Sequence, residues 1–307
     1  MAYNNWNQLS TLLRLLDDER NDIYIHIDKR SGNFPRQLLE SSVKSSGITF
    51  IERKNVYWAD YSQADVEMDL MSAASSVMSY QYYHLLSGMD LPLKTQDEIH
   101  AFFNNEHREF IAMTPDGGKY CEKHARYYHF LIHNRFYRTC KPLKAIDRGF
   151  MYIQRILGLK RSFGKELKIA TGWQWFSITD DFLKYILSQR SYIKKMFSYV
   201  LDVDEKFVGT MVNKLGNYDR LFYVTKPGEG DDSFRKGCQR YIDFSRPVPQ
   251  PYTWGRDDPE KDFCELINSG MLFARKFDER VNQDIIDRIV NYLEEKAHND
   301  THIVPGV

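Results

Sequence analysis

The sequence predicts an α/β protein with a mostly parallel sheet flanked by helices, on three observations. Short β-branched or aromatic runs alternate along the chain with runs of helical spacing, which is the order that crossover helices produce. The 307 residues are 42% hydrophobic and carry a formal net charge of zero, as a folded domain does. No stretch approaches the roughly 20 apolar residues of a membrane span. We therefore expect one domain over residues 1–307.

The elements of the first third follow from periodicity. Leu9, Leu12, Leu13 and Leu16 share one face of a helix over 6–16. Residues 22–28 alternate as a strand does. The remaining elements predicted here are a helix over 34–46, a strand over 48–51, a helix capped by Ser62 with Val66, Leu70, Ala73, Ala74, Val77 and Met78 on its apolar face, and a strand over 82–86.

The later elements rest mainly on capping signals. Thr95 and Glu98 form a capping box that opens a helix through Phe103. Thr179 and Asp204 are candidate N-caps of helices to about 197 and 215. We also expect strands over 110–113, 173–178, 221–224 and 241–244, a last helix capped by Asn282 with Ile285, Ile289 and Leu293 on one face, and a frayed tail over 299–307.

Positive charge is concentrated in one segment of the chain. Residues 119–168 hold 13 Lys and Arg against three Asp and Glu, a net charge of +10, together with many Tyr and Phe. We interpret 116–170 as an inserted basic helical lobe whose partner is an anionic acceptor, lipid headgroups or nucleic acid. The alternative, of equal weight, is a solvated helical face.

Composition and the motifs that are missing exclude several classes of protein and of ligand site. The four cysteines are scattered without a Cys-x-x-Cys pair and the first residues are polar, so a reduced intracellular protein without a structural zinc site is expected. No Gly-x-Gly-x-x-Gly or P-loop motif occurs, which disfavours the ordinary dinucleotide and P-loop sites. The histidines lack metal-ligand spacing.

Near the C-terminus, two cations interrupt an apolar run. Arg275 and Lys276 lie between Leu272-Phe273-Ala274 and Phe277, and charges this close to a core usually face an anion. An enzyme that expels a diphosphate needs cations where negative charge develops. The alternative is a strand end whose two cations reach solvent along their apolar stems.

Five segments, in order, carry a family resemblance. It is to the core-2/I-branching β-1,6-N-acetylglucosaminyltransferase family, glycosyltransferase family 14, which also holds the peptide O-xylosyltransferases. The resemblance runs from about residue 1 to about 295 and is thin across the basic lobe. The segments are IYIHID (23–28), VYWADYS (56–62), LSGMDLPL (86–93), GWQWFSI (172–178) followed by Asp204-Glu205, and PYTW (251–254) leading to LFARKF (272–277).

The resemblance implies a GT-A-like, Rossmann-like fold and an inverting glycosyltransferase that takes its sugar from a UDP-sugar without a metal. N-acetylglucosamine and xylose are the expected sugars. Residues 1–115 would form the nucleotide-binding half and 171–298 the acceptor and catalytic half. Lys276 matches a phosphate-binding lysine, Arg256 its companion arginine, and Glu205 the catalytic base. His26 and Asp28 fall at the strand end on the nucleotide side.

Each role has a plainer alternative. An acid such as Glu205 also suits the first turn of a helix, and there the helix end would weaken it as a base. Asp202-Val203-Asp204 could hold Mn²⁺ or Mg²⁺ in place of the cations. Asp90 could contact the donor or form a turn, and His26 could be a satisfied strand histidine. Arg275 is grouped with the donor residues, and Trp173, Trp175 and Tyr241 with the acceptor, although buried rings are the commoner outcome.

Two departures from the family shape the expected context. Members usually begin with a full strand before the segment that matches residues 1–5, so an edge of the sheet is expected to be missing. Eukaryotic members carry a membrane anchor and several disulfides, and this sequence shows neither. We expect a bacterial-type cytoplasmic enzyme that lies at the inner membrane face. Its acceptor would be a glycan, and a lipid-linked glycan precursor is one candidate. No nucleic-acid partner is expected. The alternative is an inactive module that binds a sugar nucleotide, or nucleic acid through the basic lobe.

Overall fold

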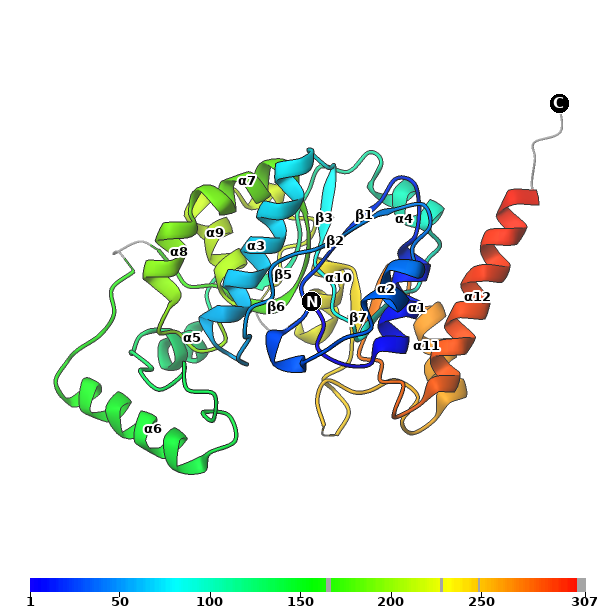
Figure 1. The fold of residues 1–307 in the computed structure, drawn as a ribbon. Coiled ribbons are helices and arrows are strands. Elements are labelled where there is room, and N and C mark those ends of the chain that lie inside the picture. The colour runs from blue at the N-terminus through cyan, green and yellow to red at the C-terminus, as the bar shows by residue number, and fades with distance from the viewer. Residues whose placement is uncertain (164–166, 227–228, 248, 303–307) are drawn as a thin grey trace.

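The computed structural model describes residues 1–307 except 164–166, 227–228, 248 and 303–307. Its named strands form three small sheets, in the orders β1-β2, β3-β6-β5 and β4-β8-β7, with helices on either side (Figure 1). The expected α/β class, with sheets flanked by helices, is confirmed. The pairing is mixed rather than mostly parallel, because β1–β2 and β7–β8 are parallel whereas β3–β6, β5–β6 and β4–β8 are antiparallel.

The first sheet is a parallel pair at the N-terminus. β1 (Asp22–Ile25) and β2 (Gly47–Phe50) are joined through the 3-10 turn η1 (Lys29–Ser31) and helix α2 (Arg36–Ser41). Helix α1 (Trp6–Leu16) buries Leu9, Leu12 and Leu13 as predicted. The strand expected over 22–28 is shorter than predicted, and so is the helix expected over 34–46.

The second sheet is antiparallel and has β6 at its centre. β6 (Thr171–Thr179) pairs with β3 (Tyr82–His84) on one edge and β5 (Phe110–Thr114) on the other. Helix α3 (Tyr61–Val77) packs beside it and begins one residue before Ser62, with Asp60 at the N-cap position. The end of its predicted apolar face is wrong, since Val77 and Met78 are 68% and 52% exposed.

A second group of helices closes the core of this sheet. α7 (Asp180–Ser188), α8 (Arg190–Phe197) and α9 (Phe207–Leu215) bury Phe182, Phe197 and Phe207 against it. Thr179 caps α7 as predicted, but the helix expected to run to 197 divides at Gln189. The helix expected from 205 begins at Phe207.

The third sheet brings together segments that are far apart in the chain. β4 (Asp90–Pro92) pairs with β8 (Phe273–Arg275), which pairs with β7 (Arg240–Ile242). The predicted strand over 221–224 is not formed: in the described part of the chain, Leu221 makes one isolated bridge, to Glu109. The other elements are α4 (Gln96–Phe103) with its predicted capping box, η2 (Tyr218–Arg220), α10 (Gly230–Cys238), α11 (Pro259–Ile267) and α12 (Gln283–His302).

Residues 116–170 contain α5 (Gly118–Ala125) and α6 (Lys141–Ile156). In Figure 1, α6 lies at the lower left, away from the sheets. Its inward side is polar: Asp147 is bonded to His129 Nδ1 at 2.7 Å and to the Tyr137 hydroxyl at 2.9 Å. Among the described residues, no helix combines the length and apolarity needed to cross a membrane.

Candidate active site

The C-terminal cationic segment lies where β8 meets β4. Arg275 stands opposite Asp90 in the register of the two strands. Its guanidinium donates to Asp90 Oδ1 at 2.8 Å and to the Ser87 hydroxyl, and it covers the Trp175 ring at 4.4 Å from the ring centre. Asp90 also accepts the Ser87 backbone N–H at 2.7 Å. Arg275 therefore contacts two other residues predicted for the site, Asp90 and Trp175.

Lys276 is the cation in this segment that is left facing other cations. Its ammonium has no hydrogen bond or ion pair among the described residues, and burial lowers its pKa, with the charges of Arg275, Arg280 and Arg256 acting in the same direction. Asp278 opposes them, but it is already paired with Arg280 at 2.7 Å. We call Arg256, Arg275, Lys276 and Arg280 the cation cluster.

Tryptophan contacts hold the cation cluster in place. The Trp254 backbone N–H donates to the Lys276 carbonyl at 3.0 Å, and its indole N–H donates to the Arg275 carbonyl at 2.9 Å. The next residue, Gly255, has φ +81°, and a Cβ there would lie 2.9 Å from Ile285 Cγ2. Only glycine suits that position, which turns the chain so that Arg256 is exposed beside Lys276.

A group of carboxylates lies on the other side of the predicted site. Asp204 is buried and accepts the Gln63 amide N–H at 3.0 Å. Burial, followed by the charges of Glu205 and Asp202, raises its pKa to about 7. Glu67 is fully buried and accepts the Gln174 amide at 2.6 Å, and burial raises its pKa, with the charge of Asp204 adding to the shift. We call Glu67, Asp204 and Glu205 the carboxylate cluster.

Strand β6 contacts residues of both clusters. The Gly172 N–H donates to the Glu205 carbonyl at 2.9 Å, the Gln174 side chain holds Glu67, and the Trp175 ring lies under Arg275. A strand rises about 3.3 Å per residue, so these contacts span roughly 10 Å along β6. The segment that carries Lys276 and the segment that carries Glu205 therefore contact the same strand, through Arg275 on Trp175 and through the Glu205 carbonyl on Gly172.

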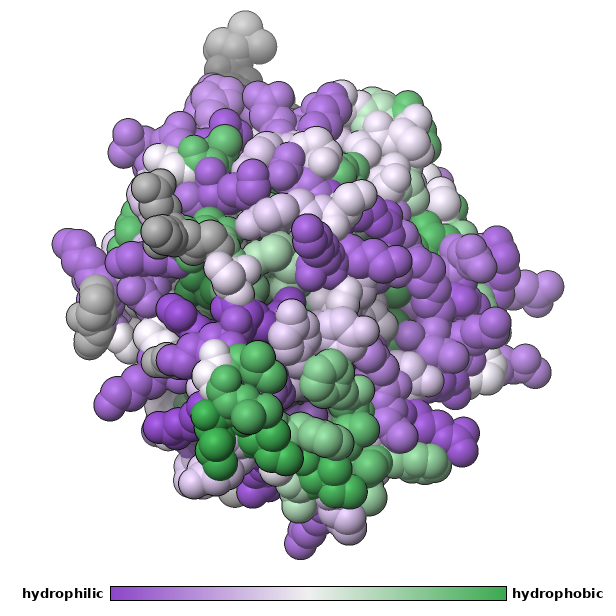
Figure 2. Space-filling model, turned by 90° about the vertical axis from the view of Figure 1, so that its left-hand side faces the viewer, coloured by the Kyte–Doolittle hydropathy of each residue, from purple (hydrophilic) through white to green (hydrophobic). Residues whose placement is uncertain are grey.

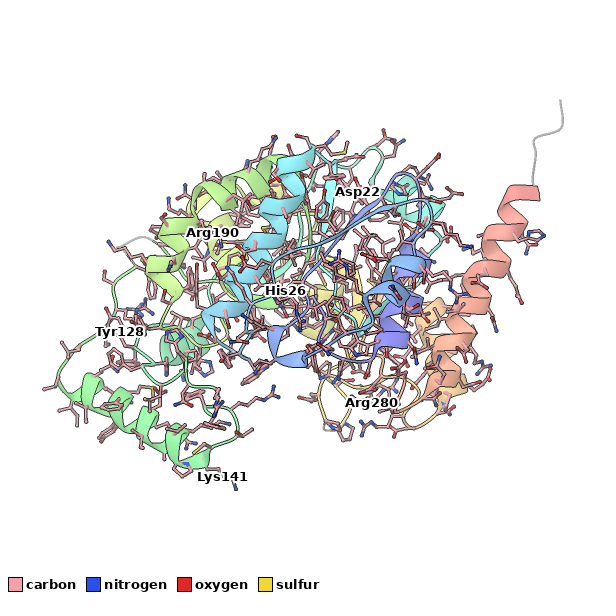
Figure 3. The ribbon with its side chains drawn as sticks, viewed as in Figure 1. Asp22, His26, Tyr128, Lys141, Arg190 and Arg280 are labelled. Carbon is pink, nitrogen blue, oxygen red and sulfur yellow. The ribbon has the colours of Figure 1, made fainter. Side chains whose placement is uncertain are left out.

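His26 and Asp28, which were predicted to lie on the nucleotide side of the site, form hydrogen bonds or ion pairs with other residues of the protein. His26 Nε2 accepts the Lys54 backbone N–H at 2.9 Å, and burial lowers the pKa of the ring to about 4. Asp28 is paired with the Arg30 guanidinium at 2.7 Å and accepts its backbone N–H. Figure 3 shows His26 near the middle of the molecule. The contacts of His26 are those of a strand histidine whose hydrogen bonds are satisfied within the protein. A contact of His26 or Asp28 with the nucleotide stays a prediction.

The remaining aromatic residues lie in two places. Trp173 is half-buried and stacks on Phe234, with ring centres 5.4 Å apart. Tyr241 stacks on Trp254 at 5.3 Å and donates its hydroxyl hydrogen to Glu265 at 2.5 Å. Trp175 is 8% exposed. These contacts leave the acceptor role of the three rings a prediction.

The two carboxylates of the Asp202-x-Asp204 triplet have different partners. Asp202 is bonded to His124 Nδ1 at 2.9 Å, whereas Asp204 is bonded to Gln63. The described residues include no group of three or more His, Cys, Asp or Glu arranged to hold a metal ion. A divalent ion here stays the alternative to the cation cluster, and an activity assay decides between them.

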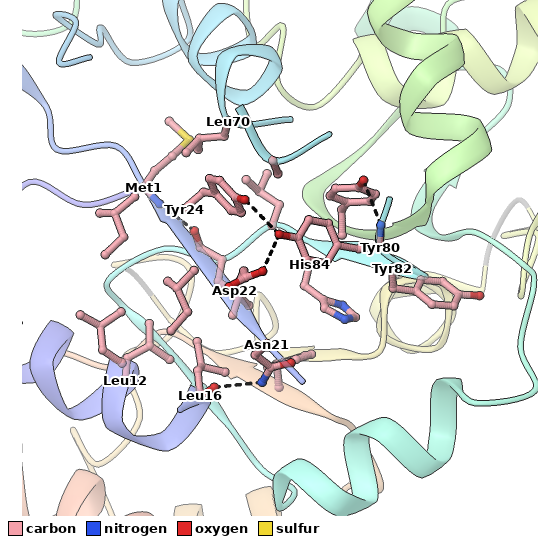
Figure 4. A pocket seen from close by; sticks show the side chains of 18 of the residues that line it. Met1, Leu12, Leu16, Asn21, Asp22, Tyr24, Leu70, Tyr80, Tyr82 and His84 are labelled. Carbon is pink, nitrogen blue, oxygen red and sulfur yellow. Dashed lines mark hydrogen bonds between the residues drawn. The ribbon is translucent and has the colours of Figure 1, made fainter. Parts of the chain in front are cut away.

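A cavity of about 450 Å³ borders this region, among β1, α3 and β3 (Figure 4), and Glu67 and Ser87 are part of its wall. Its walls are mainly apolar, and a short polar chain crosses it from the Tyr24 hydroxyl to that of Tyr80, which donates to Asp22 at 2.6 Å. Burial lowers the pKa of His84, also in the wall, to about 3. The cavity's described lining contains none of the site residues predicted from sequence, so we do not assign the donor site to it.

Sequence reasoning missed Glu67, a member of the carboxylate cluster, and Gln63, whose amide donates to Asp204. They are four residues apart on α3 and therefore share one face of the helix. That face continues into Leu70 and Ala74, which are buried. An acid in register with buried apolar positions is the signal that could have found Glu67, since a carboxylate at such a position needs a partner.

Comparison with known proteins decides the family. The model of the family described as "Branch: Core-2/I-Branching enzyme" matches residues 1–258. The chain belongs to this family. The expected family is thereby confirmed.

The curated relatives of this Core-2/I-Branching family chain include xylosyltransferases of mammals. It is 23% identical to xylosyltransferase 2 of Canis lupus familiaris over 299 residues, which is 91% of this chain and 31% of that protein. It is 24% identical to xylosyltransferase 1 of Homo sapiens over 302 residues, 93% and 29% of the two chains. The chain thus spans about a third of the length of these relatives.

Among solved structures, the apo form of mouse xyloside xylosyltransferase 1 aligns over 75% of this chain and 86% of that one, with 13% identity and a TM-score of 0.30. A likeness this distant does not define the fold. The α/β architecture follows from the chain's own strands and helices.

Proposed function

We propose that this chain is an inverting glycosyltransferase that moves N-acetylglucosamine or xylose from a UDP-sugar to a hydroxyl of a glycan, without a metal ion. The observation that supports the proposal is that β6 contacts Arg275 of the cation cluster as well as Glu67 and Glu205 of the carboxylate cluster. Family membership supports the reaction class, and the xylosyltransferase relatives make xylose one of the two sugars to test first.

In the proposed reaction the acceptor oxygen attacks the anomeric carbon from the face opposite UDP. The new carbon–oxygen bond forms as the bond to the diphosphate breaks, and that bonding pair leaves with UDP. Glu205 takes the proton of the acceptor hydroxyl, a role worth roughly 10²–10⁴-fold in rate. Attack from the opposite face inverts the configuration at that carbon.

The cation cluster would receive the charge of the leaving diphosphate. Lys276 is suited to this because its ammonium is not paired with a carboxylate in the described structure, and the nearby Asp278 is already paired with Arg280. Arg256 can bind two phosphate oxygens at once, and Lys276 acts as a point charge. Arg275 is held by Asp90, so we give it the role of positioning this segment.

The carboxylate cluster would support the base. Asp204 interacts electrostatically with both Glu205 and Glu67, and the amides of Gln63 and Gln174 donate to Asp204 and Glu67. The Gly172–Glu205 backbone bond fixes the turn that carries Glu205 to the edge of β6. We propose that the reaction takes place in the cytoplasm, with a glycan acceptor that is lipid-linked.

The deciding experiment compares Glu205→Gln with the wild-type protein. UDP binding is followed by thermal shift, because a ligand of the folded state stabilises it, and transfer from UDP-xylose and UDP-N-acetylglucosamine is followed by UDP release. We expect unchanged UDP binding and a turnover reduced by roughly 10²–10⁴-fold. Wild-type-like turnover by Glu205→Gln would remove the base from the mechanism.

A second pair of variants tests the cations. Lys276→Gln should weaken UDP binding and lower turnover by roughly tenfold or more, because it removes a charge from the diphosphate site. Lys261→Gln, at an exposed position of α11, is the matched control and should change neither. If the wild-type protein binds a sugar nucleotide and turns over none, the chain is a binding module instead.

A further inference from the structure

Helix α6 presents an uncovered apolar face to solvent. Ile146, Phe150, Ile153 and Leu157 follow the i, i+4, i+7, i+11 spacing of a single helix face, and they are 51%, 41%, 52% and 64% exposed. The face continues at the end of the helix with Ile156, which is 70% exposed. Figure 2 shows a contiguous hydrophobic patch on the lower part of this side of the molecule, where α6 lies.

The charges of α6 lie on a different face and have one sign. Lys141, Lys144, Arg148 and Arg155 fall on the side away from the apolar face at 100° per residue. The one acid of the helix, Asp147, is buried against His129 and Tyr137. Figure 3 shows Lys141 at the lower end of α6.

The apolar face contributes one ring contact within the lobe, from Phe150 to Phe130 with ring centres 6.4 Å apart, and both rings stay exposed. α6 is attached on a third side through Asp147 and through Gln154, which accepts the Tyr128 N–H at 2.8 Å and donates to its carbonyl at 2.9 Å. Contiguous exposed apolar surface of this kind marks an interaction site in a folded protein.

We propose that α6 docks on an anionic lipid surface, lying in the plane of the interface with Ile146, Phe150 and Ile153 inserted among the acyl chains. A basic helix with an apolar opposite face has the composition of an interfacial helix. Its positive charges complement acidic headgroups, each adding about a factor of five in affinity near such a surface. A second copy of the chain is a poorer occupant, because it would bring two strongly basic lobes together. The docking does not depend on the transfer reaction.

The lobe that carries α6 also contacts the predicted site. His124 of α5 is bonded to Asp202 at 2.9 Å, two residues from Asp204, and its carbonyl accepts the Leu201 N–H. His133 is bonded to Asp60, at the start of α3. Docking through α6 would therefore bring the carboxylate cluster to the membrane side, where a lipid-linked acceptor is presented. This last consequence, unlike the docking, rests on the proposed function.

The test is co-flotation of the full chain with vesicles of phosphatidylcholine alone or with about a third of phosphatidylglycerol. We expect binding to the anionic vesicles to be at least about tenfold stronger than to the neutral ones. Binding to the anionic vesicles should weaken about tenfold or more in the double variant Phe150→Ser/Ile153→Ser, because it removes the inserting side chains. The control Val77→Ser/Met78→Ser replaces two exposed apolar residues of α3 and should bind as the wild type does.

A charge variant separates the two contributions. Lys144→Gln/Arg148→Gln removes two charges, so it should lose about 25-fold in binding to anionic vesicles and leave any binding to neutral vesicles unchanged. Unchanged melting temperatures show that the variants fold. The docking is overturned if the wild type binds neither vesicle, if the α3 control loses as much as the α6 variant, or if light scattering finds a dimer that Phe150→Ser/Ile153→Ser dissolves. Sugar transfer to a soluble acceptor should be the same in the wild type and in all of these variants. A wild type that binds anionic vesicles but transfers no sugar would count against the proposed function and not against the docking.

Discussion

Replacing Asp204 by Asn is expected to stabilise the protein at neutral pH. Burial and the charges of Glu205 and Asp202 raise the pKa of this carboxyl from 3.8 to about 7 in the folded chain. Between these values the folded state keeps a proton that the unfolded state has released. Stability therefore falls as the pH rises from about 4 to about 7 and stays low above that.

The size of the effect follows from the pKa shift. A difference of about three pKa units at roughly 1.4 kcal/mol each corresponds to about 4 kcal/mol lost by pH 8. Asn cannot ionise, and its oxygen can keep the 3.0 Å bond to Gln63. Its amide N–H groups need a partner in a buried place, at a cost of about 1–2 kcal/mol. The net gain is about 2–3 kcal/mol at pH 8, or roughly 5 °C in melting temperature.

The assay is the melting temperature of both proteins from pH 5 to pH 8. We expect similar values at pH 5, a wild type that loses stability toward pH 8, and a shallower decline for Asp204→Asn. The pKa of Glu67 is also raised, so this carboxyl accounts for the decline in melting temperature with pH that remains in Asp204→Asn. Asp287→Asn, at an exposed position of α12, should follow the wild type. The reasoning is refuted if Asp204→Asn melts below the wild type at pH 8 with an unchanged pH slope.

Three further predictions concern the cation cluster. Asp90→Ala leaves Arg275, whose side chain is 19% exposed, without its carboxylate, and should cost about 2–4 kcal/mol of unfolding free energy by urea titration; a loss below about 0.5 kcal/mol would mean that the pair adds little. Gly255→Ala meets both the strain of φ +81° and Ile285, and should cost about 2–4 kcal/mol and weaken UDP binding; unchanged melting and binding would contradict the role of this turn. Transfer should survive an excess of EDTA within about twofold, whereas a loss that Mn²⁺ restores would assign the diphosphate to a metal at Asp202 and Asp204.

The elements that the sequence predicted well depend on neighbours within a few residues. The Thr95–Glu98 capping box and the Thr179 N-cap are made by groups three residues apart, and helical spacing alone places Leu9, Leu12 and Leu13 in the core. Elements near the limit of stability were predicted less well. The expected strand over 221–224 has one bridge to a distant residue, and a strand without a ladder has no local means of forming.

The candidate site shows the same division. Lys276 and Glu205 were named because residues around each match a family motif, and the structure attaches both segments to β6. Arg275 and Asp90 were both named as donor residues, but they are 185 residues apart, and only the β4–β8 register makes them partners. Glu67 was not named, because its burial depends on how α3 packs against β6.

The sequence by itself determined the family, the α/β class, the capped helices and the strong positive charge of residues 119–168, since each is written in residue types and short spacings. Only the tertiary structure decided the mixed strand pairing, the partner of each buried charge and the exposure of the α6 apolar face. The physical reason is that pairing and burial are properties of contacts between distant segments, and those contacts exist only once the chain has folded.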